Sequence, residues 1–427
     1  MVSRETVCLR QLGGDRAGEE RAGRFFANKK VTAEKIVASW SERTGAASAG
    51  RHVLAIQDTT AVTFDTGKDC RRGLGQLNQG NAHGVLAHVM MAVDADSGAC
   101  LGLVGGSVWN REGLVTTSSD DRPLEERESR RWVETAEQAI EVLAPAAMVT
   151  IVSDREGDIY PLWATIPAGR VHVLGRAMTN RRLAGGGLLF DAAADFAVAD
   201  TRTIALRAQP PARAKRDAKL ELRFGTVTIA RSPNEKDRTL AKTVRLSLVE
   251  VREIDPPEGV EPIHWRLLTT HDVTDVAMAW RIVGWYQLRW TIEQLFRTMK
   301  SQGLRLEGSQ LETAERLVKL TAAAVKAACI TMQLVQERDG VHGRAASEVF
   351  SEAEIDTFEA LTPTLEGKTE RQRNPHPPRS LARASWVAAR LGGWNCYYRP
   401  PGPITMRRGL ERFQAMHEGR MLGLRAR

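Results

Sequence analysis

Residues 148–154 read MVTIVSD, a short run of mostly apolar residues that ends on an aspartate. A run of this length, bounded by Pro145, is typical of a strand that is buried on both faces of a sheet. The preceding residues 124–143 carry apolar side chains at helical spacing, so we expect a helix to lead into the strand. A helix followed by a buried strand predicts an α/β fold.

Other segments extend this unit in both directions. Upstream, three apolar segments are expected to be consecutive antiparallel strands because short turn-like pieces, such as DADSG (94–98), join them. Downstream, a helix and another strand are expected. The predicted elements are strands at 53–57, 85–95, 100–108 and 171–175 and a helix at 159–165.

The pattern of residues changes twice more along the chain. Between about 180 and 262, alternating polar and apolar residues predict an inserted antiparallel β subdomain. Helical sequence returns after Thr270, with segments at 311–337, 380–391 and 406–421. We therefore expect three regions: a helical amino-terminal lead-in at 1–50, an α/β core at 51–302 and a helical carboxy-terminal domain at 303–427.

The composition favours a polyanionic partner. The 427 residues include 60 Lys and Arg against 52 Asp and Glu, which gives a formal charge of +8 and a pI near 9.4. The five Cys are scattered and form no C-x-x-C pair, so we expect neither a disulfide framework nor a zinc site, and a reducing, cytoplasmic location. No apolar run approaches the roughly 20 residues that a membrane span needs, and no membrane association is expected.

Two aspartates follow apolar strand sequences. Asp58 comes after HVLAIQ and Asp154 after MVTIVS, so each carboxylate is expected where its strand ends. Carboxylates at two strand ends can converge, and the divalent ions that promote phosphodiester chemistry prefer carboxylate oxygens. The alternative is that each aspartate caps a helix or starts a turn. Glu156 and Asp158 are competing acids in the same DREGD sequence.

The segment WYQLRWTIEQLFRTMK (285–300) has no Gly or Pro and is expected to form one continuous helix. One face is apolar and should be buried: Trp285, Leu288, Ile292, Leu295, Phe296 and Met299. A second stripe is polar and mostly basic: Tyr286, Arg289, Glu293, Arg297 and Lys300. This stripe either contributes its glutamate to a site or is a solvated face on which Glu293 pairs with Arg289 and Arg297.

The spacing Y-(2)-R-(3)-E-(6)-K at Tyr286, Arg289, Glu293 and Lys300 resembles the signature of the insertion-sequence-four family of DDE transposases. Other segments are similar to the branch of that family that contains transposon Tn-five: QDTTAVTF (57–64), VSDREGDIY (152–160) and SLARASWVAARLGGW (380–394). These motifs occur in the order of that branch, and the resemblance extends from about Arg24 to the end of the chain.

The resemblance implies a ribonuclease-H-like mixed sheet with a β insertion before the last acidic helix. It implies that Asp58, Asp154 and Glu293 are the catalytic residues and hold two metal ions, Mg²⁺ or Mn²⁺. It also implies cut-and-paste transposition, in which water cleaves each transposon end, the freed 3′ hydroxyl forms a hairpin, the hairpin opens and the end joins target DNA. Each step is an in-line displacement at phosphorus, which needs placement and charge neutralisation but no organic cofactor.

The polar stripe is implied to contact DNA. Arg289, Arg297 and Lys300 would hold phosphates beside the cleaved bond, and Tyr286 would donate a hydrogen bond to a backbone oxygen.

Two residues outside the stripe are also implied as DNA contacts. Trp265 stands where the family carries a Trp that shelters a flipped base, although a Trp on a strand also commonly fills core space. Arg176 matches a family Arg near the hairpin. The basic clusters Arg181–Arg182 and Arg213–Arg216 are candidate phosphate contacts or solvated charges. His83 and His88 are expected to be structural.

The implied partners are transposon-end and target DNA and a second copy of the chain in a homodimer. The matching region begins only near Arg24, so part of the family's end-binding region is expected to be missing. An alternative function follows, in which the chain is a non-mobilising regulator that dimerises with a full-length transposase and inhibits it. A nuclease without end specificity is a third possibility, against which the Y-R-E-K stripe argues.

Overall fold

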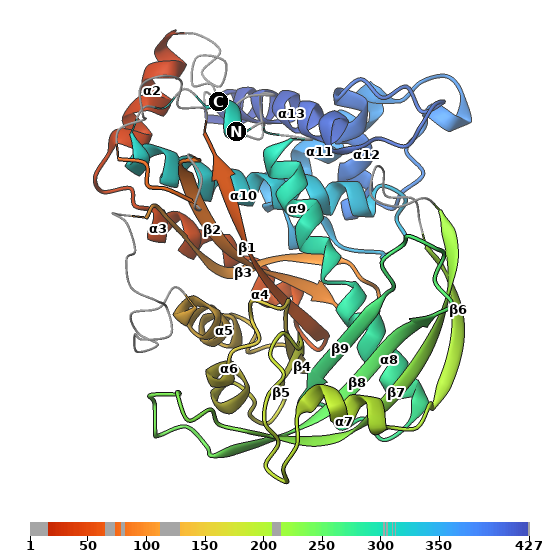
Figure 1. The fold of residues 1–427 in the computed structure, drawn as a ribbon. Coiled ribbons are helices and arrows are strands. Elements are labelled where there is room, and N and C mark those ends of the chain that lie inside the picture. Colours follow the sequence, from red (N-terminus) through yellow and green to blue (C-terminus); the bar gives the residue numbers. More distant parts are fainter. Residues whose placement is uncertain are drawn as a thin grey trace.

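The chain forms a mixed α/β fold around one nine-stranded sheet, within the part that the computed structural model describes (Figure 1). The described residues are 16–64, 73–77, 82–111, 129–206, 215–301, 304, 306–309, 311 and 313–425. The strands are β1 (His52–Thr63), β2 (Gly84–Asp94), β3 (Cys100–Trp109), β4 (Met148–Ser153), β5 (Val171–Arg176), β6 (Asp200–Leu206), β7 (Arg216–Ala230), β8 (Thr243–Ile254) and β9 (His264–Thr269).

The strand order is β3-β2-β1-β4-β5-β9-β8-β7-β6. β1, β4 and β5 are parallel to one another, and every other neighbouring pair is antiparallel. The seam between β5 and β9 is short, because only three residue pairs join them, from Leu174↔Thr269 to Arg176↔Leu267. The strands predicted between 180 and 262 therefore extend the same sheet beyond this seam.

Helices cover both faces of the sheet. They are α2 (Arg16–Ala27), α3 (Ala33–Ala38), α4 (Thr44–Ala47), α5 (Arg130–Val142), α6 (Tyr160–Thr165), α7 (Leu189–Asp195), α8 (Val276–Gln287), α9 (Trp290–Lys300), α10 (Ala314–Glu337), α11 (Glu352–Leu365), α12 (Leu381–Leu391) and α13 (Pro403–Arg425). Short 3₁₀ turns are η1 (Ser39–Ser41), η4 (Leu306–Gly308), η5 (Ala346–Glu348) and η6 (Glu370–Gln372).

The two faces of the sheet bury separate cores because side chains alternate along a strand. On β1, Leu54 and Ile56 belong to a cluster shared with α8, α9 and α10. Their neighbours Val53 and Ala55 belong to a second cluster shared with α5 and α6. Strand β2 is buried along its whole length, as a strand covered on both faces must be.

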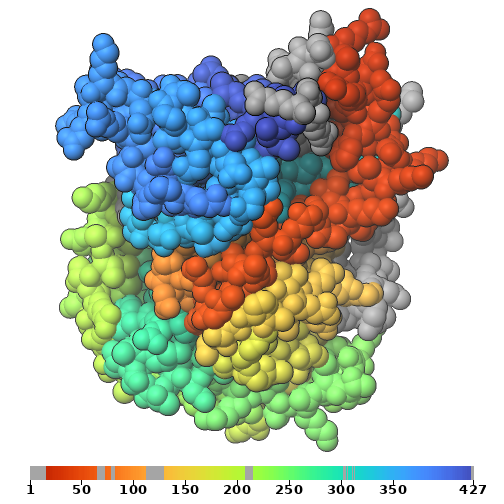
Figure 2. All heavy atoms as spheres, turned by 180° about the vertical axis from the view of Figure 1, so that it is seen from behind, coloured from red at the N-terminus to blue at the C-terminus, as the bar shows by residue number. Residues whose placement is uncertain are grey.

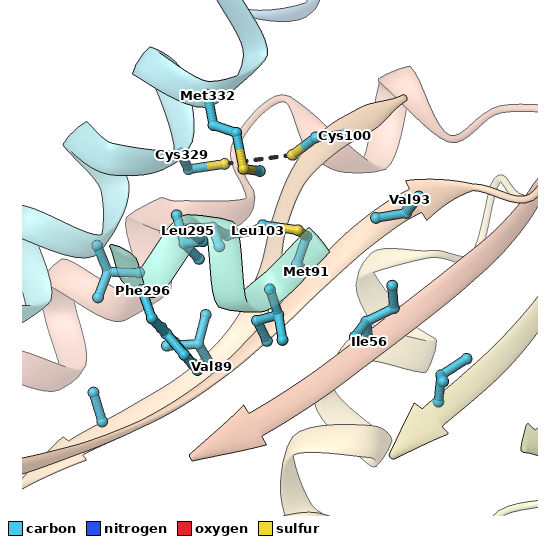
Figure 3. Close-up of a cluster of buried hydrophobic side chains, with 14 of the residues drawn as sticks. Ile56, Val89, Met91, Val93, Cys100, Leu103, Leu295, Phe296, Cys329 and Met332 are labelled. Atoms are coloured by element: carbon cyan, nitrogen blue, oxygen red, sulfur yellow. Dashed lines mark hydrogen bonds between the residues drawn. The ribbon is translucent and has the colours of Figure 1, made fainter. Parts of the chain in front are cut away.

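Helix α10 joins the sheet to the carboxy-terminal helices. Figure 3 shows Cys329 and Met332 of α10 beside Cys100 of β3, with the two sulfur atoms of Cys100 and Cys329 3.9 Å apart. α10 is long and apolar enough to cross a membrane, but 72% of its apolar window is buried inside the protein. Its composition therefore reflects its place in the core.

The last three helices form a third core with the end of α10. The rings of Phe358 on α11 and Phe413 on α13 stack with their centroids 3.6 Å apart. Figure 2 shows these carboxy-terminal helices, in blue, on the same side of the molecule as the amino-terminal segment in red. Between α11 and α12, residues 366–380 contain only the short turn η6.

Two predictions about elements were wrong. β1 does not end at Asp58, because TTAVT continues the alternating pattern and pairs with β2 as far as Thr63↔Gly84. Residues 285–300 are not one helix, because α8 ends at Gln287 and α9 begins at Trp290. Between the two helices, backbone amides donate to the carbonyl three residues earlier. The Arg289 amide, for example, donates to the Tyr286 carbonyl at 3.1 Å, so this turn is tighter than a turn of α-helix.

Candidate active site

The register of the sheet brings two predicted acids side by side. The last pair between parallel β1 and β4 is Ile56↔Val152, and Asp58 and Asp154 each lie two residues beyond it. Asp154 follows the end of β4, as predicted, whereas Asp58 lies within β1. Both carboxylates therefore stand at the same edge of the parallel strands, although β1 continues past that edge.

The third acid comes from α9, which packs against β1. Glu293 is linked to Asp58 through Arg289, which lies at the start of α9. The Arg289 guanidinium donates from Nη1 to Asp58 Oδ2 at 3.2 Å and from Nη2 to Glu293 Oε1 at 2.9 Å. The Arg289 side chain is only 10% exposed, so this bridge is largely shielded from water.

The pKa of Asp58 records the crowding of negative charge. Burial is the largest cause that raises it, the neighbouring Asp154 carboxylate adds to the shift, and the pKa reaches about 7. Arg289 opposes the shift without cancelling it. The site is thus a place where negative charges converge and are incompletely compensated by the protein.

Three carboxylates provide the oxygen donors that Mg²⁺ and Mn²⁺ prefer, and the pKa of Asp58 shows that two of them repel each other. Their chemistry therefore fits hard divalent ions. In the described residues, however, no group of three His, Cys, Asp or Glu side chains stands in the positions of a preformed metal site. Arg289 takes the place between Asp58 and Glu293, so a metal would have to displace one of its two contacts.

Further predicted residues surround the acids. Tyr286 is buried and its pKa is raised, first by burial and also by Asp154, while Arg289 and Arg176 oppose the shift. The Trp265 ring packs edge-on against Tyr286, with centroids 5.6 Å apart. The structure thus brings Tyr286, Arg289, Trp265 and Arg176 to the acids, and Tyr286 and Arg289 are not the solvated face of the alternative interpretation.

Arg297 and Lys300 occupy the later turns of α9. Arg297 is exposed, and no described contact links it to the acids. Lys300 is half-buried, and burial lowers its pKa while Glu307 raises it. The predicted stripe therefore divides into a half that contacts the acids and a half that makes no contact with them among the described residues.

The competing acid Asp158 is not available for a metal. Its buried carboxylate accepts hydrogen bonds from Trp163 Nε1 at 3.1 Å, from the Met178 and Thr179 amides at 2.9 and 3.1 Å, and from Arg181 Nη2 at 2.8 Å. Its side chain is fully buried. Arg181 is therefore paired rather than a free phosphate contact. The Glu156 side chain is exposed. Its pKa is nevertheless raised, first because part of the carboxylate is desolvated and then because Asp154 carries a negative charge nearby.

Other predicted features have structural roles. His88 is fully buried, and its ring nitrogens hydrogen-bond Thr59 Oγ1 at 2.8 Å and Gln57 Oε1 at 3.2 Å. Arg216 forms a bidentate ion pair with Glu253, so it is not a free basic group. Arg182 is exposed. Arg213 lies outside the described residues.

No pattern in the sequence indicates the cavity of about 330 Å³ that lies beside Arg176. Its wall includes Arg155, Phe190, His264 and Arg266, which come from three separate segments of the chain. Among these four wall residues, only Arg155 could have been suspected from the sequence, because it follows Asp154 directly. These wall residues come together because β5 pairs with β9 over a short seam, and no local sequence pattern reveals that pairing.

Comparisons with known proteins bear on this site. Among solved structures, the chain is similar to a piggyBac transposase in a synaptic complex with hairpin DNA, solved by cryo-electron microscopy, with 12% identity and a TM-score of 0.37. The alignment covers 87% of this chain and 54% of that one, so the chain spans about half the length of that protein. Residues 128–330, just under half of the chain, match the family model of the transposase DDE domain. This matched region holds Asp154, Glu293, Tyr286 and Arg289, and it supports a transposase of the DDE class.

Proposed function

We propose that this protein is a cut-and-paste DNA transposase whose catalytic residues are Asp58, Asp154 and Glu293. One observation carries the proposal: three carboxylates from β1, β4 and α9 converge, and two of the three lie in the region that matches the transposase DDE domain. The finer placement in the insertion-sequence-four family, in the branch of transposon Tn-five, rests on the Y-R-E-K spacing and the ordered motifs.

The half of the sheet formed by β1 to β5 is proposed to be a ribonuclease-H-like unit. In support, three antiparallel strands are followed by α5 and then by two parallel strands, and both strand-borne acids lie at one edge. The strands β6 to β8 would be the insertion before the acidic helix α9, with residues 303–427 as a dimerisation domain.

The proposed reaction is a series of in-line displacements at phosphorus: cleavage by water, hairpin formation by a 3′ hydroxyl, hairpin opening and strand transfer. Two Mg²⁺ or Mn²⁺ ions, when held by Asp58, Asp154 and Glu293, would activate the attacking oxygen and stabilise the leaving one. Arg289 would orient a phosphate with whichever guanidinium nitrogens its carboxylate partners release. The Tyr286 hydroxyl would donate a hydrogen bond to a backbone oxygen of the DNA.

The remaining contacts are placed around this centre. Trp265, half-buried against Tyr286, would offer a stacking surface for an extruded base. Arg176 would hold a phosphate beside it, and Arg297 and Lys300 would hold phosphates further along α9. The expected partners are transposon ends, target DNA and a second copy of the chain.

The test is DNA cleavage by purified full-length protein with Mg²⁺ or Mn²⁺, using a labelled duplex that carries the transposon end. Glu293→Gln should reduce the cleavage rate by more than the roughly 10–100-fold that the loss of an outer-shell partner of a metal site costs. Glu134→Gln is the matched control, because Glu134 also pairs with an arginine four residues earlier on an α-helix and is similarly exposed. Undiminished cleavage by Glu293→Gln would refute the assignment of the site.

A further inference from the structure

A cavity of about 330 Å³ lies on the side of β9 that faces away from Trp265. Trp265 and Arg266 are consecutive on β9 and therefore point to opposite faces of the sheet. Trp265 packs against Tyr286 and the core under α8, whereas Arg266 lies over the Phe190 ring of α7, 4.2 Å from its centroid. We call the cavity the β9 pocket; β5, α7 and β9, which border it, lie close together in Figure 1.

The wall of the β9 pocket combines positive charge with apolar surface. It is lined by Arg155, Arg176, Ala177, Met178, Phe190, Glu261, Pro262, His264 and Arg266. Arg266 and His264 both contact the buried Glu250 carboxylate, at 3.1 and 2.8 Å, so that carboxylate balances part of their charge. Arg155 is exposed and makes no ion pair with any of the described residues, so its charge is available to a ligand.

Arg176 connects the β9 pocket to the acidic site. Its Nη2 donates to the His264 carbonyl at 2.7 Å, which fixes the guanidinium at the rim of the pocket. The pKa of Arg176 is lowered by burial first and then by Arg155, and Tyr286 and Arg289 also affect it. Arg176 therefore belongs to the pocket wall and is also an electrostatic neighbour of Tyr286 and Arg289 beside the acids.

The size of the β9 pocket selects the ligand. About 330 Å³ is near the lower end of the roughly 300–1,000 Å³ that pockets for small organic ligands occupy. A single nucleotide fits a pocket of this volume, whereas a base pair does not, because it contains a second base. Guanidinium groups hold phosphate, and an aromatic ring with a stacked arginine is a surface on which any base can stack.

We propose that the β9 pocket binds one unpaired nucleotide of a DNA strand that leaves the acidic site, with its phosphate on Arg155 and Arg176 and its base against the stacked Arg266 and Phe190 side chains. The inference deepens the proposed function, because it takes DNA as the ligand from there. It adds a second stacking surface, on the face of β9 opposite to Trp265.

The test measures binding in EDTA, so that no cleavage is required. The probes are a fluorescent ten-nucleotide thymidine strand and the same strand with abasic sites throughout, titrated into the full chain at several salt concentrations. The wild type should bind the intact strand more tightly, within the roughly 5- to 150-fold that stacking of one base contributes. Phe190→Leu should reduce this preference by about tenfold or abolish it.

Arg155→Gln tests the proposed phosphate contact. The substitution should leave the fold intact, because Arg155 is exposed. It should lower the slope of log Kd against log salt concentration by about 0.7, the value for one phosphate contact on a single strand. Arg202→Gln is the control, because Arg202 lies over the ring of Trp280 much as Arg266 lies over Phe190, but away from the pocket. Arg202→Gln should change neither the preference for the intact strand nor the salt slope.

The outcomes separate the pocket from the proposed function. An unchanged base preference in Phe190→Leu, or equal slopes for Arg155→Gln and Arg202→Gln, overturns the pocket even if the protein cleaves DNA normally. A reduced base preference in Phe190→Leu together with a smaller salt slope in Arg155→Gln supports the pocket, even if the wild type fails to cleave a transposon end with Mg²⁺.

Discussion

Asp154 and Asp158 belong to the same DREGD segment, yet their carboxylates have opposite surroundings. Among the described residues, the Asp154 carboxylate accepts one hydrogen bond, from the Glu156 amide at 2.8 Å, and it lies close enough to Asp58 to raise the pKa of that residue. Asp158 is enclosed by donors from α6 and from the residues that follow β5. At the scale of single residues, one acid is proposed to be catalytic and the other fixes the loop beside Arg176.

Asp158→Ala should lower the free energy of unfolding by about 3–5 kcal/mol, because it leaves the buried Arg181 guanidinium without its carboxylate. Urea denaturation followed by circular dichroism measures the change. Glu156→Ala is the control and should shift the free energy by no more than about 0.5 kcal/mol, because Glu156 is exposed. Equal effects of the two substitutions would contradict the structural role of Asp158.

Sequence reasoning at this scale placed Asp154 at a strand end and Glu293 beside Arg289, as found. It treated Asp158 as a competing ligand because the hydrogen bonds that enclose it come from residues up to 23 positions away. It also missed the bridge from Arg289 to Asp58, which spans 231 positions. Local spacing cannot reveal contacts that only the folded sheet creates.

At the scale of elements, α8 rests on a group of histidines at the far end of the sheet. The Trp285 ring contacts the rings of His52 and His271, with centroids 4.6 and 5.1 Å away. Both histidines hydrogen-bond the Thr150 hydroxyl of β4 at 2.8 Å, and His172 stacks on His271 at 3.8 Å. The next residue of α8 is Tyr286, so this group sets the position of the helix that enters the site.

These histidines should make the fold sensitive to acid. Burial lowers the pKa of His52 from 6.5 to about 4 and that of His271 to about 3. Below pH 6.5 the unfolded chain therefore binds protons that the folded chain does not, and stability should fall as the pH drops from 6.5 toward 4. Above pH 6.5 these residues should contribute no slope.

Denaturation of wild type and His271→Gln at a series of pH values measures this effect. The variant should lose less stability than the wild type between pH 6.5 and 4, because one group of lowered pKa has been removed. Parallel curves for the two proteins would show that His271 does not cause the slope.

At the scale of the whole molecule, the amino-terminal segment ties the sheet to α10. Trp40 is fully buried, its indole donates to the Ala322 carbonyl at 3.1 Å, and its ring lies directly over Gly106 of β3. Lys319 of α10 donates to the carbonyls of Phe26 and Asn28 at 3.2 and 3.1 Å. The segment is thus an integral part of the core, as the red band against the body of the molecule in Figure 2 illustrates.

Trp40→Ala should lower the free energy of unfolding by about 3–5 kcal/mol, because it leaves a large cavity between β3 and α10. Phe25→Ala is the control, because that ring on α2 is 48% exposed, and its loss should cost much less. Chemical denaturation of both variants measures the difference. A small effect of Trp40→Ala would mean that the segment can detach without loosening the sheet.

The class of fold could be predicted from the sequence, because buried strands and amphipathic helices leave strong local patterns. The nine-stranded continuity could not, since nothing local indicates that β9 joins β5. For the same reason the β9 pocket, whose walls come from both sides of that junction, was not predicted.

The β5–β9 seam has a mechanical consequence. A sheet bends most easily where the fewest hydrogen bonds cross between neighbours, and here only three residue pairs connect its two halves. The crease runs between Arg176 on one side and Trp265 with Arg266 on the other. A small flexing about this line would change the separation of Arg176 from Trp265 and Arg266 while leaving the three acids, all on the β1–β5 side, undisturbed.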